Sequence, residues 1–276
     1  MCTVIVSHDP SADVPLLVAA LRDEMTDRAW EPPARHWPER PGLLGGRDRH
    51  AGGTWLAAHP APAAASPRLG AVLNGRVTAE PFHGRRPVLD STVAPARAKR
   101  SRGELPLLAA DSAELRLDGT DLDAFDPFHL LRADAEAATL STWDGADLTE
   151  RALPRGVSVI VNTGLDAAEP RAQRFAPLFA HRRPRPDAEL LRTATDPYTI
   201  WGAWAELIDT AAGSGARTAG TGSGADDPSA IVARVELDGG RVWATSSATL
   251  LALTGDGLRY AFTDSLGDPH AWRMVH

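Results

Sequence analysis

The sequence predicts an α+β fold in which helices cover β-sheets, because strand patterns occur at both ends of the chain and helical patterns lie between them. The first strand is predicted at residues 2–7, where Cys2, Val4 and Val6 share one face and the apolar content indicates burial on both faces. Short strands separated by glycine turns predict a C-terminal meander over residues 231–237, 241–245, 248–254 and 258–263.

The middle of the chain supplies the remaining elements. Apolar and β-branched runs predict strands at residues 14–21, 54–58, 70–74, 128–132, 137–143 and 157–162. Prolines and glycines predict a loop over 35–49. Apolar residues at steps of three and four predict helices over 101–115, 122–125 and, most clearly, 187–212. Residues 213–228 are rich in Gly, Ser, Thr and Asp, which predicts a flexible loop within a single domain spanning 1–276.

Composition excludes several classes of function. The 276 residues carry a net charge of −7, which argues against a nucleic-acid or membrane-surface partner. No stretch approaches the roughly 20 apolar residues of a membrane-spanning helix. One cysteine cannot form an intramolecular disulfide, so a cytoplasmic location is expected. No cofactor or metal is predicted.

The position of the only cysteine indicates a candidate nucleophile. Residues as small as cysteine permit enzymatic removal of the initiator methionine, which would leave an α-amine and a thiol together on Cys2. An α-amine has a pKa of roughly 7.7–8.0 and can accept the thiol proton. We therefore expect a mature chain that starts at Cys2, with a thiol pKa lowered by its own ammonium and by Arg22. The alternative is a small apolar residue near a frayed end.

Four polar residues at the ends of apolar strands are further catalytic candidates: Arg22, Asp23, Asn74 and Asn162. The two asparagines are the only ones in the chain, and an amide at a strand end is a suitable donor to an oxyanion. The arginine and aspartate follow a buried apolar run, at a point where a strand delivers side chains to the rim of a site. The alternatives are a surface salt bridge for the charged pair and turn-forming roles for the asparagines.

A glycine-rich segment over residues 45–55 provides candidates for substrate binding, because glycines let the backbone approach a ligand closely. It lacks the pattern of a phosphate-binding loop. The candidate substrate-binding residues in this segment are Arg47, Asp48, Gly53, Thr54 and Trp55.

Several short motifs occur in the order seen in a known family. They are Met1-Cys2-Thr3 and the segments 16–24, 46–56, 73–76, 101–105, 156–166 and 245–251. Each motif is short, but the ordered series covers nearly the whole chain and resembles the NRDE family of transport and Golgi organisation protein 2-like proteins. The resemblance implies an αββα sandwich of two mostly antiparallel sheets covered by helices, similar to N-terminal-nucleophile hydrolases, with Cys2 at the nucleophile position.

A more distant resemblance to bile-salt hydrolases and penicillin V acylases implies roles for the strand-end residues. Arg22 and Asp23 would orient the nucleophile, and Asn74 and Asn162 would form the oxyanion hole.

The chain also departs from the family pattern around this expected pocket. Leu21 and His129 stand where the pattern has asparagine, and Ser246 stands where it has arginine. Residues 167–171 replace a Pro-Trp-Pro-Lys run. His129 and Ser246 are therefore added to the candidate substrate-binding residues, and the family's substrate is not carried over to this chain.

Two functions agree with these observations. The first is a cysteine N-terminal-nucleophile hydrolase or acyltransferase that acts on a C–N amide or acyl bond of a small molecule. The alternative is a non-catalytic carrier or chaperone of a hydrophobic anion such as haem or acyl-CoA.

Overall fold

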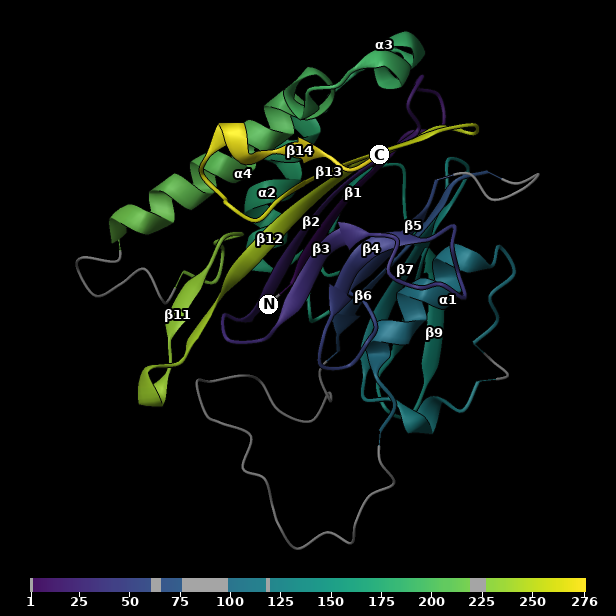
Figure 1. Cartoon of the computed structure of the whole chain (residues 1–276), viewed down its shortest axis with the longest axis vertical. Coiled ribbons are helices and arrows are strands. Elements are labelled where there is room, and N and C mark those ends of the chain that lie inside the picture. Colours follow the sequence, from purple (N-terminus) through teal and green to yellow (C-terminus); the bar gives the residue numbers. More distant parts are fainter. Residues whose placement is uncertain (1, 61–65, 76–98, 118–119, 219–226) are drawn as a thin grey trace, which may run out of the picture.

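The computed structural model describes residues 2–60, 66–75, 99–117, 120–218 and 227–276. In this part of the chain, two antiparallel seven-stranded sheets lie face to face, and helices cover their outer faces in an αββα arrangement (Figure 1). The predicted fold class is therefore confirmed.

The first sheet carries the N-terminus of the described chain in its interior. Its order is β10-β1-β2-β12-β13-β14, with β11 paired to β12. Because β1 has a neighbour on each edge and packing on each face, its residues are buried on both faces. The strands are β1 (Thr3–His8), β2 (Leu16–Met25), β10 (Gly156–Ile160), β11 (Arg234–Glu236), β12 (Val242–Leu253), β13 (Leu258–Thr263) and β14 (Arg273–Met274).

The second sheet is a meander in which consecutive strands pair, in the order β3-β4-β5-β6-β7-β8-β9. Its strands are β3 (Trp30–Ala34), β4 (Leu44–Asp48), β5 (Leu56–His59), β6 (Arg68–Asn74), β7 (Phe128–Ala133), β8 (Ala138–Trp143) and β9 (Leu148–Ala152).

Side-chain alternation along β1 separates two apolar cores. Val4 and Val6 point between the sheets, where they join residues of the second sheet. Ile5 points to the other face, where it joins residues of α2 (Pro170–His181), α3 (Ala188–Thr193) and α4 (Pro197–Thr218). On the far side of the molecule, α1 (Leu105–Asp111) covers the second sheet. Short 3-10 turns complete the elements at Arg102–Glu104, Leu122–Ala124, Asp238–Gly240 and Pro269–Ala271.

The prediction of a loop over residues 35–49 is wrong for residues 44–48, which form strand β4, whereas residues 35–43 form a loop. The glycines that suggested a loop are required by packing: a Cβ atom on Gly46 would lie 2.3 Å from the ring of Trp55. The preceding strand β3 was not predicted either. It lies at the edge of its sheet, where prolines are compatible with a strand.

The two strands predicted at 241–245 and 248–254 are one continuous strand, β12. The pairing with β2 shifts between Thr245 and Ser247, so Ser246 is an additional residue accommodated by a β-bulge. The bulge keeps the strand paired while it changes the direction of the side chains around it.

The helix predicted at 187–212 is two helices, α3 and α4, which are separated just before Pro197. The residue before a proline avoids helical conformation, which explains the break. Helix α4 continues to Thr218, so the predicted loop begins too early, and residues 219–226 lie outside the described part. A glycine costs a helix only about 1 kcal/mol, which a long preceding helix tolerates. Among the described helices, none is long and apolar enough to cross a membrane.

Candidate functional site

Cys2 lies next to two of the predicted catalytic residues in the first sheet. Thr3 pairs with Leu21 of β2, and Val4 pairs with Ile160 of β10. Continued toward the N-terminus, these registers place Arg22 and Asn162 on either side of Cys2. Cys2 is half-buried and packs against the core between the sheets. The thiol donates to the main-chain carbonyl of Asp23, with Sγ and O 3.5 Å apart.

Arg22 points into the space between the sheets and is almost fully buried. Its guanidinium carbon lies 4.5 Å from the ring centre of Trp55 and 5.7 Å from that of Trp30. Its Nη1 donates to Ser246 Oγ at 3.0 Å, and its Nη2 lies 3.8 Å from Glu24 Oε2. Burial lowers the pKa of Arg22 from its ordinary value, while the charges of Glu24 and Cys2 act to raise it. The guanidinium is thus fixed beside the thiol by contacts from both sheets.

The side chain of Asp23 points to the opposite face of the sheet, toward α2. Its Oδ1 accepts from Thr245 Oγ1 at 2.6 Å, and its Oδ2 lies 3.5 Å from Arg171 Nη1. The same Nη1 donates to Thr3 Oγ1 at 2.8 Å. The side chains of Asp23 and Arg171 are 0% and 4% exposed. This buried network joins α2, β1, β2 and β12 directly behind Cys2.

Asn162 faces the second sheet at the end of β10. Its Nδ2 donates to the main-chain carbonyl of Asn74 at 2.6 Å, whereas its Oδ1 is buried without a hydrogen-bond partner in the described part of the chain. An amide nitrogen has two hydrogens, so one donor remains for a ligand. The side chain of Asn74 is exposed, and the group that Asn74 contributes to this contact is its carbonyl.

His129 supports the turn that carries Asn162. Its Nε2 lies 3.3 Å from the main-chain carbonyl of Asn162, and its Nδ1 lies 2.9 Å from Thr142 Oγ1. A Cβ atom on Gly164 would lie 3.0 Å from the His129 ring, so this turn packs closely on the imidazole. His129 therefore contacts the site from the second sheet, through the main-chain carbonyl of Asn162.

The residues predicted from the glycine-rich segment separate into two groups. Trp55 contacts Arg22 and so belongs to the surroundings of the thiol. The amide of Thr54 donates to Gly103 at 2.8 Å, and a Cβ atom on Gly53 would lie 2.5 Å from the backbone of Gly103. Gly53 and Thr54 therefore allow their backbone to pack closely against that of Gly103.

Arg47 and Asp48 form ion pairs away from the thiol, and as neighbours on β4 their side chains point to opposite faces of the sheet. Arg47 Nη1 lies 3.8 Å from Glu31 Oε2, and Asp48 Oδ2 accepts from Arg28 Nε at 2.6 Å. Asp48 Oδ1 accepts from the backbone amides of His50 and Ala51. Asp48 thus organises the turn after β4.

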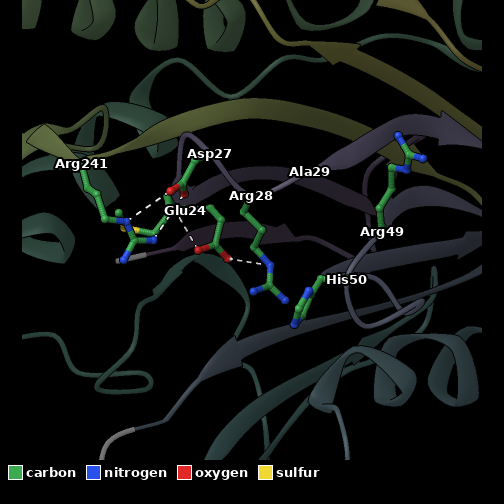
Figure 2. A pocket seen from close by; sticks show the side chains of 8 residues that line it. Glu24, Asp27, Arg28, Ala29, Arg49, His50 and Arg241 are labelled. Atoms are coloured by element: carbon green, nitrogen blue, oxygen red, sulfur yellow. Dashed lines mark hydrogen bonds and ion pairs between the residues drawn. The ribbon is translucent and has the colours of Figure 1, made fainter.

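A pocket of about 640 Å³ lies beyond Arg22, at the end of β2. Figure 2 shows Arg28 joined to Glu24, and Arg241 joined to Asp27, across this pocket. Its lining comes from Glu24, Met25, Asp27, Arg28, Ala29, Arg49, His50 and Arg241. Among the described residues, no group of His, Cys, Asp and Glu side chains is arranged to hold a metal ion.

Comparison with known proteins identifies the family of the chain. A family model described as transport and Golgi organisation 2 matches residues 1–190. The chain belongs to this family. None of the curated proteins matches it significantly.

The family match contains Cys2, Arg22 and Asn162 but ends before β12. In this transport and Golgi organisation 2 family member, β12 contributes the hydroxyls of Thr245 and Ser246 to the site. Ser246 Oγ also donates to the main-chain carbonyl of Arg22 at 3.2 Å. Ser246 therefore binds both the guanidinium group and the main-chain carbonyl of Arg22.

Sequence reasoning missed Arg171, Glu24 and Arg28 as residues connected to the site. Arg171 stands within the segment that departs from the family pattern. Glu24 and Arg28 are four positions apart, a spacing that indicates a contact only within a helix. Glu24 lies on strand β2 and Arg28 in the turn after it, so the spacing did not predict their ion pair.

The predicted lowering of the thiol pKa is contradicted for the chain that retains Met1. Burial raises the pKa of Cys2, and the charge of Asp23 raises it further. These effects outweigh the lowering by the hydrogen bond to the Asp23 carbonyl and by Arg22. The resting group is therefore a neutral thiol at neutral pH, and its attack on a substrate requires a base.

Alkylation of the folded protein by iodoacetamide should have a pH midpoint above the ordinary thiol value of about 8.5, because burial disfavours the thiolate. Cys2 is the only cysteine, so the labelled mass reports this site alone. The urea-unfolded chain is the control and should show the ordinary midpoint. A folded-state midpoint below 8.5 would contradict the burial argument.

Stability should decrease as the pH falls below about 6.5, the ordinary pKa of histidine. Burial lowers the pKa of His129, so in this window the unfolded chain binds more protons than the folded chain. The variant His129→Asn, which carries the family-pattern residue, should show a smaller slope of urea midpoint against pH. His50→Asn, at an exposed position, is the control and should keep the wild-type slope. Equal slopes for wild type and His129→Asn would refute this role.

Proposed function

We propose that the protein is a cysteine hydrolase or acyltransferase of the N-terminal-nucleophile type, acting on a C–N amide or acyl bond of a small molecule. The observation that carries the proposal is the alignment of Cys2, Arg22 and Asn162 at the ends of three neighbouring strands, on the face between the sheets. This alignment provides a nucleophile, a fixed cation and an amide donor at one end of the sandwich.

The first step of the proposed reaction is attack by the Cys2 thiol on the carbonyl carbon of the substrate. After removal of Met1, the α-amine of Cys2 accepts the thiol proton, since its ordinary pKa of roughly 7.7–8.0 lies near neutral pH. The raised thiol pKa supports a mechanism in which proton transfer accompanies attack. The free N–H of Asn162 then donates to the oxyanion, while the Arg22 guanidinium favours negative charge at the site.

Collapse of the tetrahedral intermediate breaks the C–N bond and transfers the proton from the α-amine to the leaving amine. Cys2 then carries the acyl group as a thioester. Attack by water gives the carboxylic acid, and attack by a second amine or alcohol gives acyl transfer; either route restores the thiol. Asp23 acts through Arg171, Thr3 and Thr245 as an anchor of the strands, because its carboxylate faces α2.

Intact mass and substrate turnover together test the proposal. Protein from its native host should be lighter than the full translation by one methionine. Cys2→Ser should slow turnover of an N-acyl amide panel severely and leave substrate affinity nearly unchanged. An inserted glutamate between Met1 and Cys2 is the matched control, because it keeps the thiol but blocks release of the amine; it should also be inactive.

Three outcomes would contradict the enzyme assignment. These are retention of Met1 in the native host, full activity of the inserted-glutamate variant, and absence of turnover for every amide tested. In the last case, ligand affinity that falls on replacement of Arg22 but ignores Cys2→Ser would indicate the carrier of a hydrophobic anion.

A further inference from the structure

The pocket at the end of β2 contains a guanidinium that is held in place but has donors to spare. Arg28 Nε donates to Asp48 Oδ2 at 2.6 Å and lies 3.7 Å from Glu24 Oε2. In the described part of the chain, Nη1 and Nη2 of Arg28 make no hydrogen bond. Figure 2 shows this end of the side chain pointing toward His50. Arg28 therefore presents a two-pronged donor to the pocket.

The other basic side chains of the pocket are either paired with a carboxylate or exposed to solvent. Arg241 is bound by both carboxylate oxygens of Asp27, at 3.2 and 3.4 Å, and its charge is largely compensated. Arg49 and His50 are exposed at the turn after β4. Arg28 is thus the cation of this pocket that is best prepared to bind an anion, because two parallel N–H donors match a carboxylate or phosphate.

Glu24 connects this pocket to the thiol. Its Oε2 lies 3.7 Å from Arg28 Nε and 3.8 Å from Arg22 Nη2, so the two guanidinium groups share one carboxylate. Arg22 and Cys2 are close enough for each charge to affect the pKa of the other. A small molecule that places its scissile carbonyl at Cys2 can therefore extend along β2 toward Arg28.

We propose that the substrate carries a carboxylate remote from its scissile bond, and that Arg28 binds this carboxylate with both Nη donors. This inference rests on the proposed function, whose substrate class it narrows to an anionic amide. A carboxylate is favoured over a phosphate because Glu24 and Asp27 also line the pocket. Repulsion by these carboxylates grows with ligand charge, so a dianion is penalised more than a monoanion.

Binding of two matched ligands to the full-length Cys2→Ala protein tests the inference. The ligands are N-benzoyl-6-aminohexanoate and its primary amide, which differ only in the presence of the carboxylate. A charge-assisted, bidentate contact predicts about 10-fold or tighter binding of the carboxylate in isothermal titration at low salt. Arg28→Gln should remove the difference, and Arg28→Lys should keep part of it, since lysine retains the charge but not the paired donors.

The control is Arg192→Gln, an exposed arginine of α3, which should keep the wild-type ratio. Equal affinity for the two ligands, or a ratio that survives Arg28→Gln, would overturn the subsite. Inorganic phosphate that competes more strongly than N-benzoyl-6-aminohexanoate would overturn the choice of carboxylate. If Arg28→Gln fails to fold, the ratio in Arg28→Lys decides: an undiminished ratio refutes the role of the paired donors.

The same ligands separate this inference from the proposed function. Absence of turnover by the wild type, with the affinity ratio intact, would remove the enzyme assignment and leave an anion-binding pocket. Turnover of both ligands with equal affinity would leave the enzyme and remove the subsite.

Discussion

Replacement of Arg171 by methionine is expected to lower the free energy of unfolding by about 3–5 kcal/mol, because it removes one partner of a buried ion pair. The Asp23 carboxylate, which is fully buried, would lose a guanidinium whose Nη1 lies 3.5 Å away. Methionine preserves the apolar length of the side chain, so the loss reports mainly the charge. Urea unfolding measures this change.

Arg174→Met is the matched control, because Arg174 lies one turn further along the same helix. Its ion pair with Asp227 is open to solvent, with the two side chains 51% and 46% exposed. Its loss should therefore cost less than about 1 kcal/mol. The double variant Arg171→Met with Asp23→Asn should recover part of the lost stability, since no uncompensated charge remains. Equal losses for Arg171→Met and Arg174→Met would contradict the argument.

Asn162→Ala is expected to slow turnover on the order of 10²–10³-fold, as loss of one oxyanion donor does. The second N–H of Asn162 is oriented by the first, which donates to the Asn74 carbonyl at 2.6 Å. The effect should fall on kcat more than on KM, because the contact forms as charge develops on the carbonyl oxygen. Steady-state kinetics on any amide that the wild type hydrolyses provides the measurement.

Asn74→Ala provides the comparison for this result. The carbonyl of Asn74 orients Asn162, and its side chain is exposed, so the alanine variant should keep most of the activity. A loss as large as that of Asn162→Ala would show that the Asn74 side chain is itself a donor. Unchanged kcat in Asn162→Ala would exclude it from the oxyanion hole.

Much of the fold follows from local patterns in the sequence. Alternation and glycine turns located most strands, because a half-buried strand alternates apolar and polar residues and turn-forming residues bound it. Strands β3 and β4 were missed because prolines and glycines usually indicate loops. Here the prolines lie in an edge strand, and Gly46 leaves space for the ring of Trp55, and neither circumstance can be recognised from the local sequence. Helix α2 was missed because a short segment with an internal proline carries little helical signal.

The candidate site was only partly predictable for a similar reason. Cys2, Arg22 and Asn162 stand at strand ends, and strand pairing brings such ends together without help from the rest of the chain. Alternation along β2 places Asp23 on the face opposite to Arg22, but the contact of Asp23 with Arg171 depends on where α2 packs. A partner separated by 148 residues leaves no local trace in the sequence.

Gly46 has a consequence for how this protein can change during evolution. The ring of Trp55 fills the space where a side chain at position 46 would begin, and the same ring lies 4.5 Å from the guanidinium of Arg22. Any larger residue at position 46 would displace the tryptophan and, through it, the arginine beside the nucleophile. A side chain at position 46 is therefore compatible with this position of Arg22 only if the residue at position 55 changes as well.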